Sequence, residues 1–283
     1  MRVAIVGASG LLGKYLSREW RQDEVIGFGS KDFDIRHPDE VTRIVVSMRP
    51  DWIVLAAAYT DVDGCELNPD RAFQTNTAGA LNVANAAVEA GSRLLFLSSD
   101  YVFDGNKGYP YEIGDCRNPL NVYGRSKAEA EVRIAELIPD SCIVRTSWVF
   151  GTGGKCFPDT ILKAAATRKE LEVVNDQRGC PTYGRDLARA IEQLCRMNAS
   201  GIVHVTNRGD CSWYEFASQI VGLSSLTTAV QPTTTDRFPR PARRPTYSVL
   251  SSRSLDDLRI SMPSWQDALA EYLVARNQSK SIF

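Results

Sequence analysis

The sequence predicts an α/β protein with a Rossmann-like, doubly wound parallel sheet, joined to a smaller, discontinuous α+β substrate domain. Short apolar runs alternate with longer segments of helical periodicity through the first half of the 283 residues. A glycine-rich turn directly follows the first apolar run. Alternation of this kind is typical of parallel strands joined by right-handed crossovers, with helices on both faces of the sheet.

The expected strands are short, continuous apolar runs, which is the pattern of strands buried on both faces. They lie at residues 3–6, 25–28, 53–57, 94–97, 142–144 and 202–206. The expected helices carry an apolar stripe or begin at a proline or asparagine start signal. They lie at residues 11–20, 38–48, 69–90, 121–137, 186–197 and 265–274.

The elements become shorter and more mixed after the glycine-rich stretch 151–154. We expect residues 1–150 with about 184–207 to form a dinucleotide-binding domain. Residues from about 151 to 183, with 208–283, then form a substrate-binding domain. The proline-rich segment 231–246 is expected to be a loop rather than a linker, because a helical apolar stripe still follows it.

Composition excludes several classes of partner. The 33 basic and 34 acidic side chains leave a net charge of −1 without basic or acidic runs, so neither nucleic acid nor an anionic membrane is indicated as a partner. The longest apolar run, residues 52–59, is far shorter than the roughly 20 residues of a membrane helix. The seven cysteines are widely spaced and there are two histidines, which indicates a cytoplasmic protein without a disulfide framework or resident metal.

The turn between the first strand and the first helix has the features of a dinucleotide-binding loop. Three glycines allow a tight turn, close approach of a pyrophosphate, and close packing of helix on strand. The helix N-terminus adds unpaired N–H groups and a partial positive charge. The candidate cofactor residues here are Gly7, Gly10, Leu11, Leu12 and Gly13.

The residues after the second strand bear on the choice of cofactor. An acidic residue there would bind the 2′-hydroxyl of NAD, but this chain has Gly29-Ser30-Lys31 before the first carboxylate, Asp32. Ser30 and Lys31 could hold a 2′-phosphate, which favours NADPH. The alternatives are that Lys31 is a solvated loop charge and that NADH is used.

Tyr123 and Lys127 are four residues apart on an expected helix, so their side chains share one face. An ammonium close to a phenol favours the phenolate and makes tyrosine a better acid–base catalyst. Ser99 ends the preceding strand and could hydrogen-bond a substrate carbonyl. These three residues are therefore the candidate catalytic residues; a solvent-exposed tyrosine–lysine pair is the alternative.

Several longer motifs make the sequence resemble the extended short-chain dehydrogenase/reductase superfamily and, within it, the dTDP-4-dehydrorhamnose reductase family. They occur from Gly7 to about Leu250, so the resemblance is global. The motifs are residues 98–105 (SSDYVFDG), 119–124 (PLNVYG), 145–149 (RTSWV), 175–177 (NDQ), 179–182 (GCPT) and the Arg244-Pro245 pair with Ser248 and Leu250.

The resemblance implies roles for particular residues. Ser99, Tyr123 and Lys127 are the catalytic trio, with serine where family members often have threonine. Further cofactor contacts are implied at Asp34, Ile35, Ala57, Ala58, Tyr59 and Thr60, together with Tyr123 and Lys127. Substrate contacts are implied at Val62, Ser99, Asp100 and Trp148, and Arg244 is suited to a diphosphate because guanidinium groups bind it bidentately.

The activity that the resemblance implies is NADPH-dependent reduction of a nucleotide-linked 4-keto-6-deoxy sugar, with dTDP-4-dehydro-L-rhamnose as the favoured substrate. Another nucleotide-sugar ketoreductase or epimerase, and a non-catalytic dinucleotide-binding subunit of the methionine adenosyltransferase type, are the alternatives. Some family members form a magnesium-bridged dimer through an acidic residue at the position of Tyr15. We therefore expect no metal, and a homodimer stays open.

Overall fold

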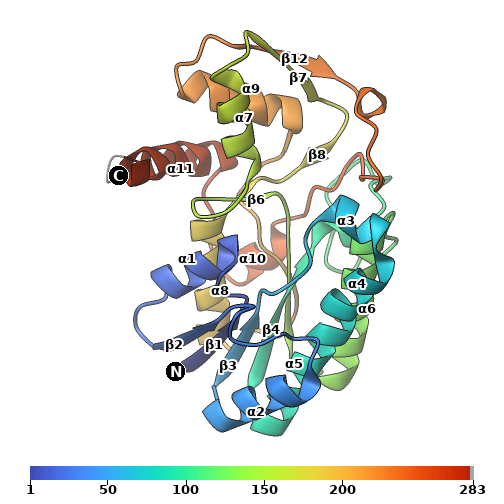
Figure 1. Cartoon of the computed structure of the whole chain (residues 1–283), viewed down its shortest axis with the longest axis vertical. Helices are drawn as coiled ribbons and strands as arrows, with labels where there is room; N and C mark the ends of the chain where they lie inside the picture. The colour runs from blue at the N-terminus through green and yellow to red at the C-terminus, as the bar shows by residue number, and fades with distance from the viewer. Residues whose placement is uncertain (281–283) are drawn as a thin grey trace.

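The computed structural model describes residues 1–280 and has a six-stranded parallel sheet at its centre (Figure 1). The strand order is β10–β5–β4–β3–β1–β2, and every neighbouring pair runs parallel. The strands are β1 (Arg2–Val6), β2 (Glu24–Phe28), β3 (Trp52–Leu55), β4 (Arg93–Ser99), β5 (Cys142–Thr146) and β10 (Gly201–His204). The chain order reverses between β1 and β3, and ligands of such sheets bind at this point, outside the carboxyl ends of the strands.

Helices cover both faces of the sheet because successive strand residues point to opposite sides. Val3 and Ile5 pack with the helices of one face, and Ala4 and Val6 pack with those of the other. The first face carries α1 (Leu11–Glu19) and α8 (Gly184–Arg196), and the second carries α2 (Pro38–Met48), α5 (Ala80–Ala90) and α6 (Val122–Leu137). The predicted doubly wound α/β fold is confirmed.

The helix predicted at residues 69–90 is present, but it contains an irregular turn. Its parts are α4 (Pro69–Phe73), a π-helical segment (Gln74–Gly79) and α5, and the short helix α3 (Val62–Leu67) precedes them. At Gly79 the side chain of Ile35 lies so close that an added Cβ would be 2.8 Å from Ile35 Cγ1. Asn76, in the π-helical segment, accepts a hydrogen bond from the Tyr59 backbone N–H at 2.7 Å and donates to Ser126 Oγ at 3.0 Å. The irregular turn thus joins the end of β3 to α6, and π-turns of this kind are frequent at functional sites.

A second group of elements lies above the carboxyl ends of the strands (Figure 1). Its helices are α7 (Phe157–Ala165), α9 (Trp213–Leu223), α10 (Arg253–Asp257) and α11 (Trp265–Lys280). Its strands form three pairs, which are β6 (Val149–Phe150) with β9 (Thr182–Tyr183), β8 (Arg178–Gly179) with β11 (Cys211–Ser212), and β7 (Glu170–Val174) with β12 (Ala229–Thr233). Two short 3₁₀ turns complete the elements, at Asp100–Val102 and Thr235–Arg237.

The expectation that residues 231–246 are all loop is wrong at one end. Residues 231–233 belong to β12, where Pro232 lies in register with Val173 of β7. Proline cannot donate to a strand ladder and is tolerated mainly at sheet edges. A two-stranded sheet consists only of edges, so this proline does not prevent strand formation.

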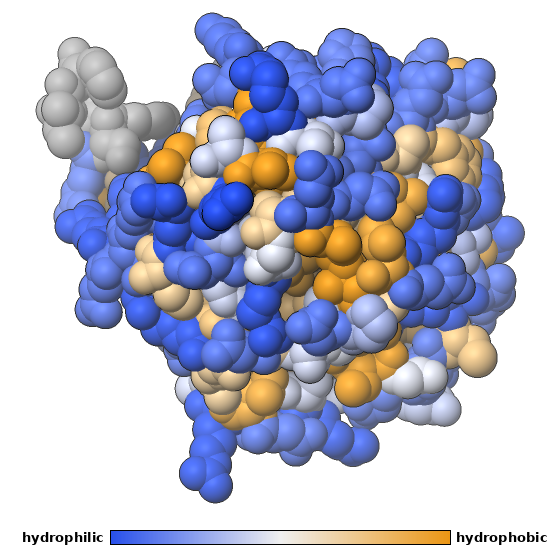
Figure 2. All heavy atoms as spheres, turned by 90° about the horizontal axis from the view of Figure 1, so that it is seen from below, coloured by the Kyte–Doolittle hydropathy of each residue, from blue (hydrophilic) through white to orange (hydrophobic). Residues whose placement is uncertain are grey.

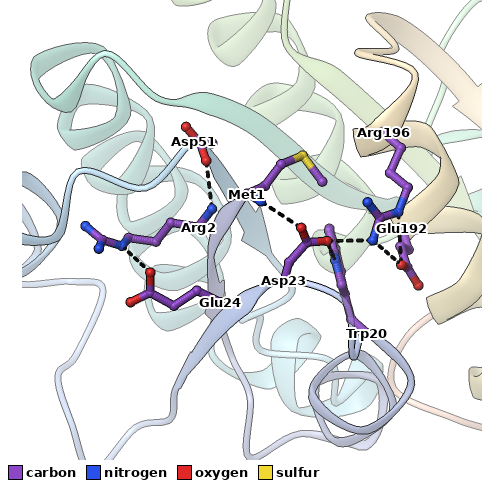
Figure 3. Close-up of polar contacts among 8 residues, drawn as sticks. All are labelled: Met1, Arg2, Trp20, Asp23, Glu24, Asp51, Glu192 and Arg196. Atoms are coloured by element: carbon purple, nitrogen blue, oxygen red, sulfur yellow. Dashed lines mark hydrogen bonds and ion pairs between the residues drawn. The ribbon is translucent and has the colours of Figure 1, made fainter.

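At the amino-terminal end of β1 and β2, ion pairs join the strands to α8. Asp23, just before β2, accepts hydrogen bonds from the amino terminus of Met1 at 2.7 Å, from Trp20 Nε1 at 2.7 Å and from Arg196 of α8 at 2.6 Å (Figure 3). The face seen from below in Figure 1 is mainly hydrophilic, with apolar side chains gathered near its middle (Figure 2). This end of the sheet lies away from the carboxyl ends of the strands, where ligands of such sheets bind.

Candidate active site

The turn after β1 can be built only with glycine at two of its positions. Gly7 has a φ of +101°, and a Cβ there would lie 2.5 Å from the backbone nitrogen of Ala57. A Cβ at Gly13 would lie 2.2 Å from the carbonyl oxygen of Gly7. The turn is therefore pressed between the ends of β1 and β3 while α1 begins directly behind it. The N-cap position of α1 is Gly10, which has no side chain to accept hydrogen bonds from the first turn. The N–H groups of that turn are therefore left for a ligand.

A cavity of about 730 Å³ extends along this edge of the sheet. Its volume is in the usual range for small-molecule and cofactor sites. The predicted cofactor residues that line it are Gly7, Gly10, Leu11, Leu12, Gly13, Ser30, Asp34, Ile35, Ala57, Ala58, Tyr59, Thr60, Tyr123 and Lys127. The predicted substrate residues that line it are Val62, Ser99, Asp100 and Trp148. One cavity thus brings together residues that are up to 141 positions apart in the chain, from Gly7 to Trp148.

The three candidate catalytic side chains reach this cavity from two elements. Ser99 is the last residue of β4, and Tyr123 and Lys127 lie in the first two turns of α6. Asn121 fixes the start of α6 by accepting a hydrogen bond from the Gly124 N–H at 2.8 Å. The Ser99 hydroxyl donates to Asp100 Oδ1 at 2.9 Å and accepts from the Tyr101 N–H at 3.1 Å.

Burial changes the proton affinity of both α6 side chains. Burial raises the pKa of Tyr123 above its ordinary value of 10, although a hydrogen bond with Ser99 lowers it in part. Burial lowers the pKa of Lys127 to about 7, and the negative charge of Glu131 opposes that change. The Lys127 Nζ lies 4.0 Å from the centre of the Phe96 ring, which provides a cation–π contact. A neutral phenol and an ammonium that readily loses its proton are a suitable pair for proton transfer near neutral pH.

Two buried polar atoms in the cavity wall have no hydrogen-bond partner among the described residues. They are Asp100 Oδ2 and Thr146 Oγ1. Burial raises the pKa of Asp100 to about 7, while hydrogen bonds with Ser248 and Ser99 lower it. A buried polar group without a partner is costly, so these atoms are suited to a polar ligand that would satisfy them.

Two tryptophans form one end of the cavity wall. The rings of Trp148 and Trp213 are stacked, with centroids 3.4 Å apart and planes 6° apart. Trp148 has a φ of +45°, and a Cβ at Gly179 would lie 2.6 Å from its ring. Trp213 Nε1 donates to Gln177 Oε1 at 3.2 Å. The Trp148 ring is therefore packed between Trp213 and the backbone at Gly179, and Trp213 is itself held by Gln177 and by contact with Phe157.

The structure does not bring two of the predicted site residues to the cavity wall. Lys31 is solvent-exposed and does not line the cavity. The Arg244 guanidinium lies outside the wall because it donates to Asp63 Oδ1 and to the Ala242 carbonyl, both at 2.6 Å. Arg244 also hydrogen-bonds to Tyr101, which does line the cavity.

Several residues that line the cavity were not predicted as site residues from the sequence, among them Arg36, Lys155 and Trp213. Arg36 had no usable signal, because the His37 N–H donates to the Asp34 carbonyl at 3.0 Å and residues 34–37 form a turn rather than an element with a regular period. For Trp213 the sequence carries one signal. Ser212 and Glu215 have the spacing of a capping box, which predicts that a helix begins at Trp213.

The described residues contain no group of three or more His, Cys, Asp or Glu side chains that could hold a metal ion. Nor does any helix among them combine the length and the apolar character that crossing a membrane requires.

Comparisons with known proteins agree along almost the whole chain. The model of the RmlD substrate binding domain matches residues 1–277. The spore coat polysaccharide biosynthesis protein SpsK of Bacillus subtilis is 41% identical, over 98% of this chain and 99% of its own. A dTDP-4-dehydrorhamnose reductase of Mycobacterium tuberculosis is 37% identical, over 99% of this chain and 95% of its own.

A solved structure has the same fold. The crystal structure of dTDP-4-dehydrorhamnose reductase from Bacillus anthracis, in complex with NADP, superposes with a TM-score of 0.94 at 38% identity. The alignment covers 97% of this chain and 99% of that one. The chain therefore belongs to the RmlD substrate binding domain family, and the enzyme class predicted from its sequence, an NAD(P)H-dependent oxidoreductase, is confirmed.

Proposed function

We propose that this chain uses NADPH to reduce the 4-keto group of a nucleotide-linked 6-deoxy sugar, with dTDP-4-dehydro-L-rhamnose as substrate and dTDP-L-rhamnose as product. One observation carries the proposal: Ser99, Tyr123 and Lys127 line the same cavity as the glycine turn after β1. A cofactor at the turn and a carbonyl at the hydroxyl groups would then share one enclosed space. The similarity to dTDP-4-dehydrorhamnose reductases supports the choice of substrate.

The residues present fit a dinucleotide. A Cβ at Gly7 would fill the space next to Ala57, and the uncapped N-terminus of α1 offers N–H groups to a pyrophosphate. Ala57, Ala58 and Tyr59 continue this wall from the end of β3. When bound, NADPH supplies the hydride of the reduction.

The protein's part in the reaction is to stabilise charge and to deliver a proton. Negative charge develops on the carbonyl oxygen of the substrate, where the hydroxyl groups of Ser99 and Tyr123 would donate hydrogen bonds. Ser99 would turn from Asp100 to do so. Tyr123 then gives its proton to the oxygen, and the Lys127 ammonium favours the phenolate that remains. The apolar walls and the tryptophan pair would exclude water from this step.

The similarity to a spore coat polysaccharide biosynthesis protein makes other nucleotide-linked keto sugars the second candidates for the substrate. The test is NADPH oxidation, followed at 340 nm, with a panel of nucleotide-linked 4-keto sugars that differ in base and stereochemistry. We expect the highest kcat/KM with dTDP-4-dehydro-L-rhamnose. Oxidation of NADPH with none of the panel would contradict the proposal, and a clear preference for another member would correct the substrate.

The stacked tryptophans give a prediction about the sugar. If Trp213 forms part of the sugar site, Trp213→Ala should raise KM for the nucleotide sugar about 2- to 10-fold, the range expected when one aromatic pair is lost. Steady-state kinetics with each substrate varied in turn measures the effect, and Trp213→Phe, which keeps an aromatic ring, is the matched control. An unchanged KM for the sugar, or an equal rise in KM for NADPH, would remove Trp213 from the sugar site.

A further inference from the structure

The segment after β2 contains two carboxylates of the kind that bind a ribose hydroxyl, and each accepts a hydrogen bond from the protein. Asp32 turns back and accepts a hydrogen bond from the Gly29 N–H at 2.7 Å, and it does not line the cavity. Asp34 does line the cavity, but Arg36 takes both of its oxygens. Neither carboxylate therefore both lines the cavity and lacks a partner, as an acidic residue that selects NAD would be expected to do.

Asp34 holds Arg36 along one edge of its guanidinium. The Arg36 Nε lies 3.0 Å from Asp34 Oδ1 and 2.9 Å from Oδ2, and a terminal nitrogen lies 2.5 Å from Oδ2. The backbone N–H of Arg36 also donates to Asp34 Oδ1, at 3.0 Å. These hydrogen bonds lower the pKa of Asp34 to about 2, so the carboxylate is ionised at neutral pH.

The other edge of the guanidinium is still available. A guanidinium has five N–H donors in a fixed planar fork, and the pairing with Asp34 occupies the Nε side. No other partner of the Arg36 side chain occurs among the hydrogen bonds and ion pairs of the described residues. Its side chain is 43% exposed and lines the same cavity as Ser30, which follows β2 by two residues.

We infer that Arg36 is the residue that selects NADPH over NADH, that its free edge binds the 2′-phosphate together with Ser30, and that Asp34 is a positioning residue for it. The inference rests on the proposed function, since it assigns the cofactor's adenosine end to this part of the cavity. This assignment replaces the one to Lys31, which carries the same charge three residues after the end of β2 but does not line the cavity. Arginine suits this task better than lysine because a planar fork can hold phosphate oxygens and a carboxylate at the same time.

The test compares Arg36→Leu with Lys31→Leu, since both remove one positive charge from exposed side chains of the same segment. Binding of NADPH, NADH, adenosine 2′,5′-bisphosphate and 5′-AMP is measured by isothermal titration calorimetry. We expect Arg36→Leu to weaken NADPH and the bisphosphate about 10- to 100-fold, as for the loss of charge-assisted hydrogen bonds. NADH and 5′-AMP should change little, and Lys31→Leu should bind all four ligands like the wild type.

The outcomes separate this inference from the proposed function. If Arg36→Leu keeps the wild-type preference for NADPH, if Lys31→Leu loses it, or if the wild type binds NADPH and NADH equally, then Arg36 is not the selecting residue. The reductase proposal would survive each of these results. If the wild type binds neither dinucleotide, the reductase proposal itself is contradicted, and the role of Arg36 is contradicted with it.

Discussion

Replacing Tyr123 with phenylalanine should reduce turnover about 10²- to 10⁴-fold, because that is the range that general acid–base groups contribute. The ring would stay in its place beside Tyr101, 5.9 Å away between centroids and nearly perpendicular to it, so the cavity keeps its shape. Binding of NADPH should change little, because the glycine turn is untouched. Steady-state kinetics with the keto sugar and titration with NADPH measure the two effects separately.

The matched control is Tyr101→Phe. Tyr101 also lines the cavity, and burial also raises the pKa of its phenol, but it follows β4 and hydrogen-bonds to Arg244. We expect this variant to keep most of its turnover. If Tyr101→Phe loses turnover and Tyr123→Phe keeps it, the proton donor has been assigned to the wrong phenol.

The second large effect is expected at Glu131, on the face of α6 that also carries Lys127. Its side chain is fully buried and accepts hydrogen bonds from Arg145 at 2.9 and 2.7 Å, from Arg117 at 2.6 Å and from Ser98 at 2.5 Å. Glu131→Gln would leave the buried Arg145 charge without its counter-ion. Removing one partner of a buried pair typically costs about 3–5 kcal/mol of folding free energy. Chemical denaturation of the variant and the wild type measures this difference.

The pH dependence of the same difference checks its cause. Burial opposes ionisation of Glu131, but the hydrogen bonds and charge of Arg145, with Ser98 and Arg117, outweigh it and hold the pKa below the ordinary value of 4.5. The stabilisation is therefore complete above about pH 4.5 and is lost as the pH falls through the folded-state pKa. The difference between Glu131→Gln and the wild type should shrink in acid.

Glu129→Gln is the control on the same helix. Glu129 makes an exposed ion pair with Arg133, four residues on, and such pairs contribute about 0.3–0.5 kcal/mol. A loss of stability at Glu131 no larger than that at Glu129 would show that the buried pair does not hold β5 against α6.

The central fold could be predicted because its signals are local. Each sheet strand contains a short apolar run, and each helix on its faces has a start signal or an apolar stripe. The π-helical turn at Gln74–Gly79 could not be predicted, because it accompanies the packing of Ile35, from a distant segment, against Gly79. The strand at Ala229–Thr233 was not predicted, because it contains Pro232. A proline fits a strand at the edge of a sheet, and the sequence does not show that this segment pairs only with β7. The division into two domains stays a prediction.

The site was predictable where its chemistry depends on spacing along one element. The glycine turn and the pair Tyr123 and Lys127 are of this kind. The choice between Lys31 and Arg36 was not predictable, because it depends on how Asp32 turns the chain back toward Gly29. Arg244 shows the same limit, since its partner Asp63 lies 181 residues away in the sequence. The assigned roles of these side chains stay proposals until variants are measured.

The proposed reduction is tested most directly with NADPH that carries deuterium at C4 of the nicotinamide, in the position that is transferred as hydride. The enzyme is incubated with dTDP-4-dehydro-L-rhamnose, and the nucleotide-sugar product is analysed by NMR and mass spectrometry. One deuterium atom at C4 of the sugar, in equal amount to the NADPH consumed, is the result that we predict. A product without the label, or unconsumed NADPH alongside an altered sugar, would show that this cavity does not carry out the reduction.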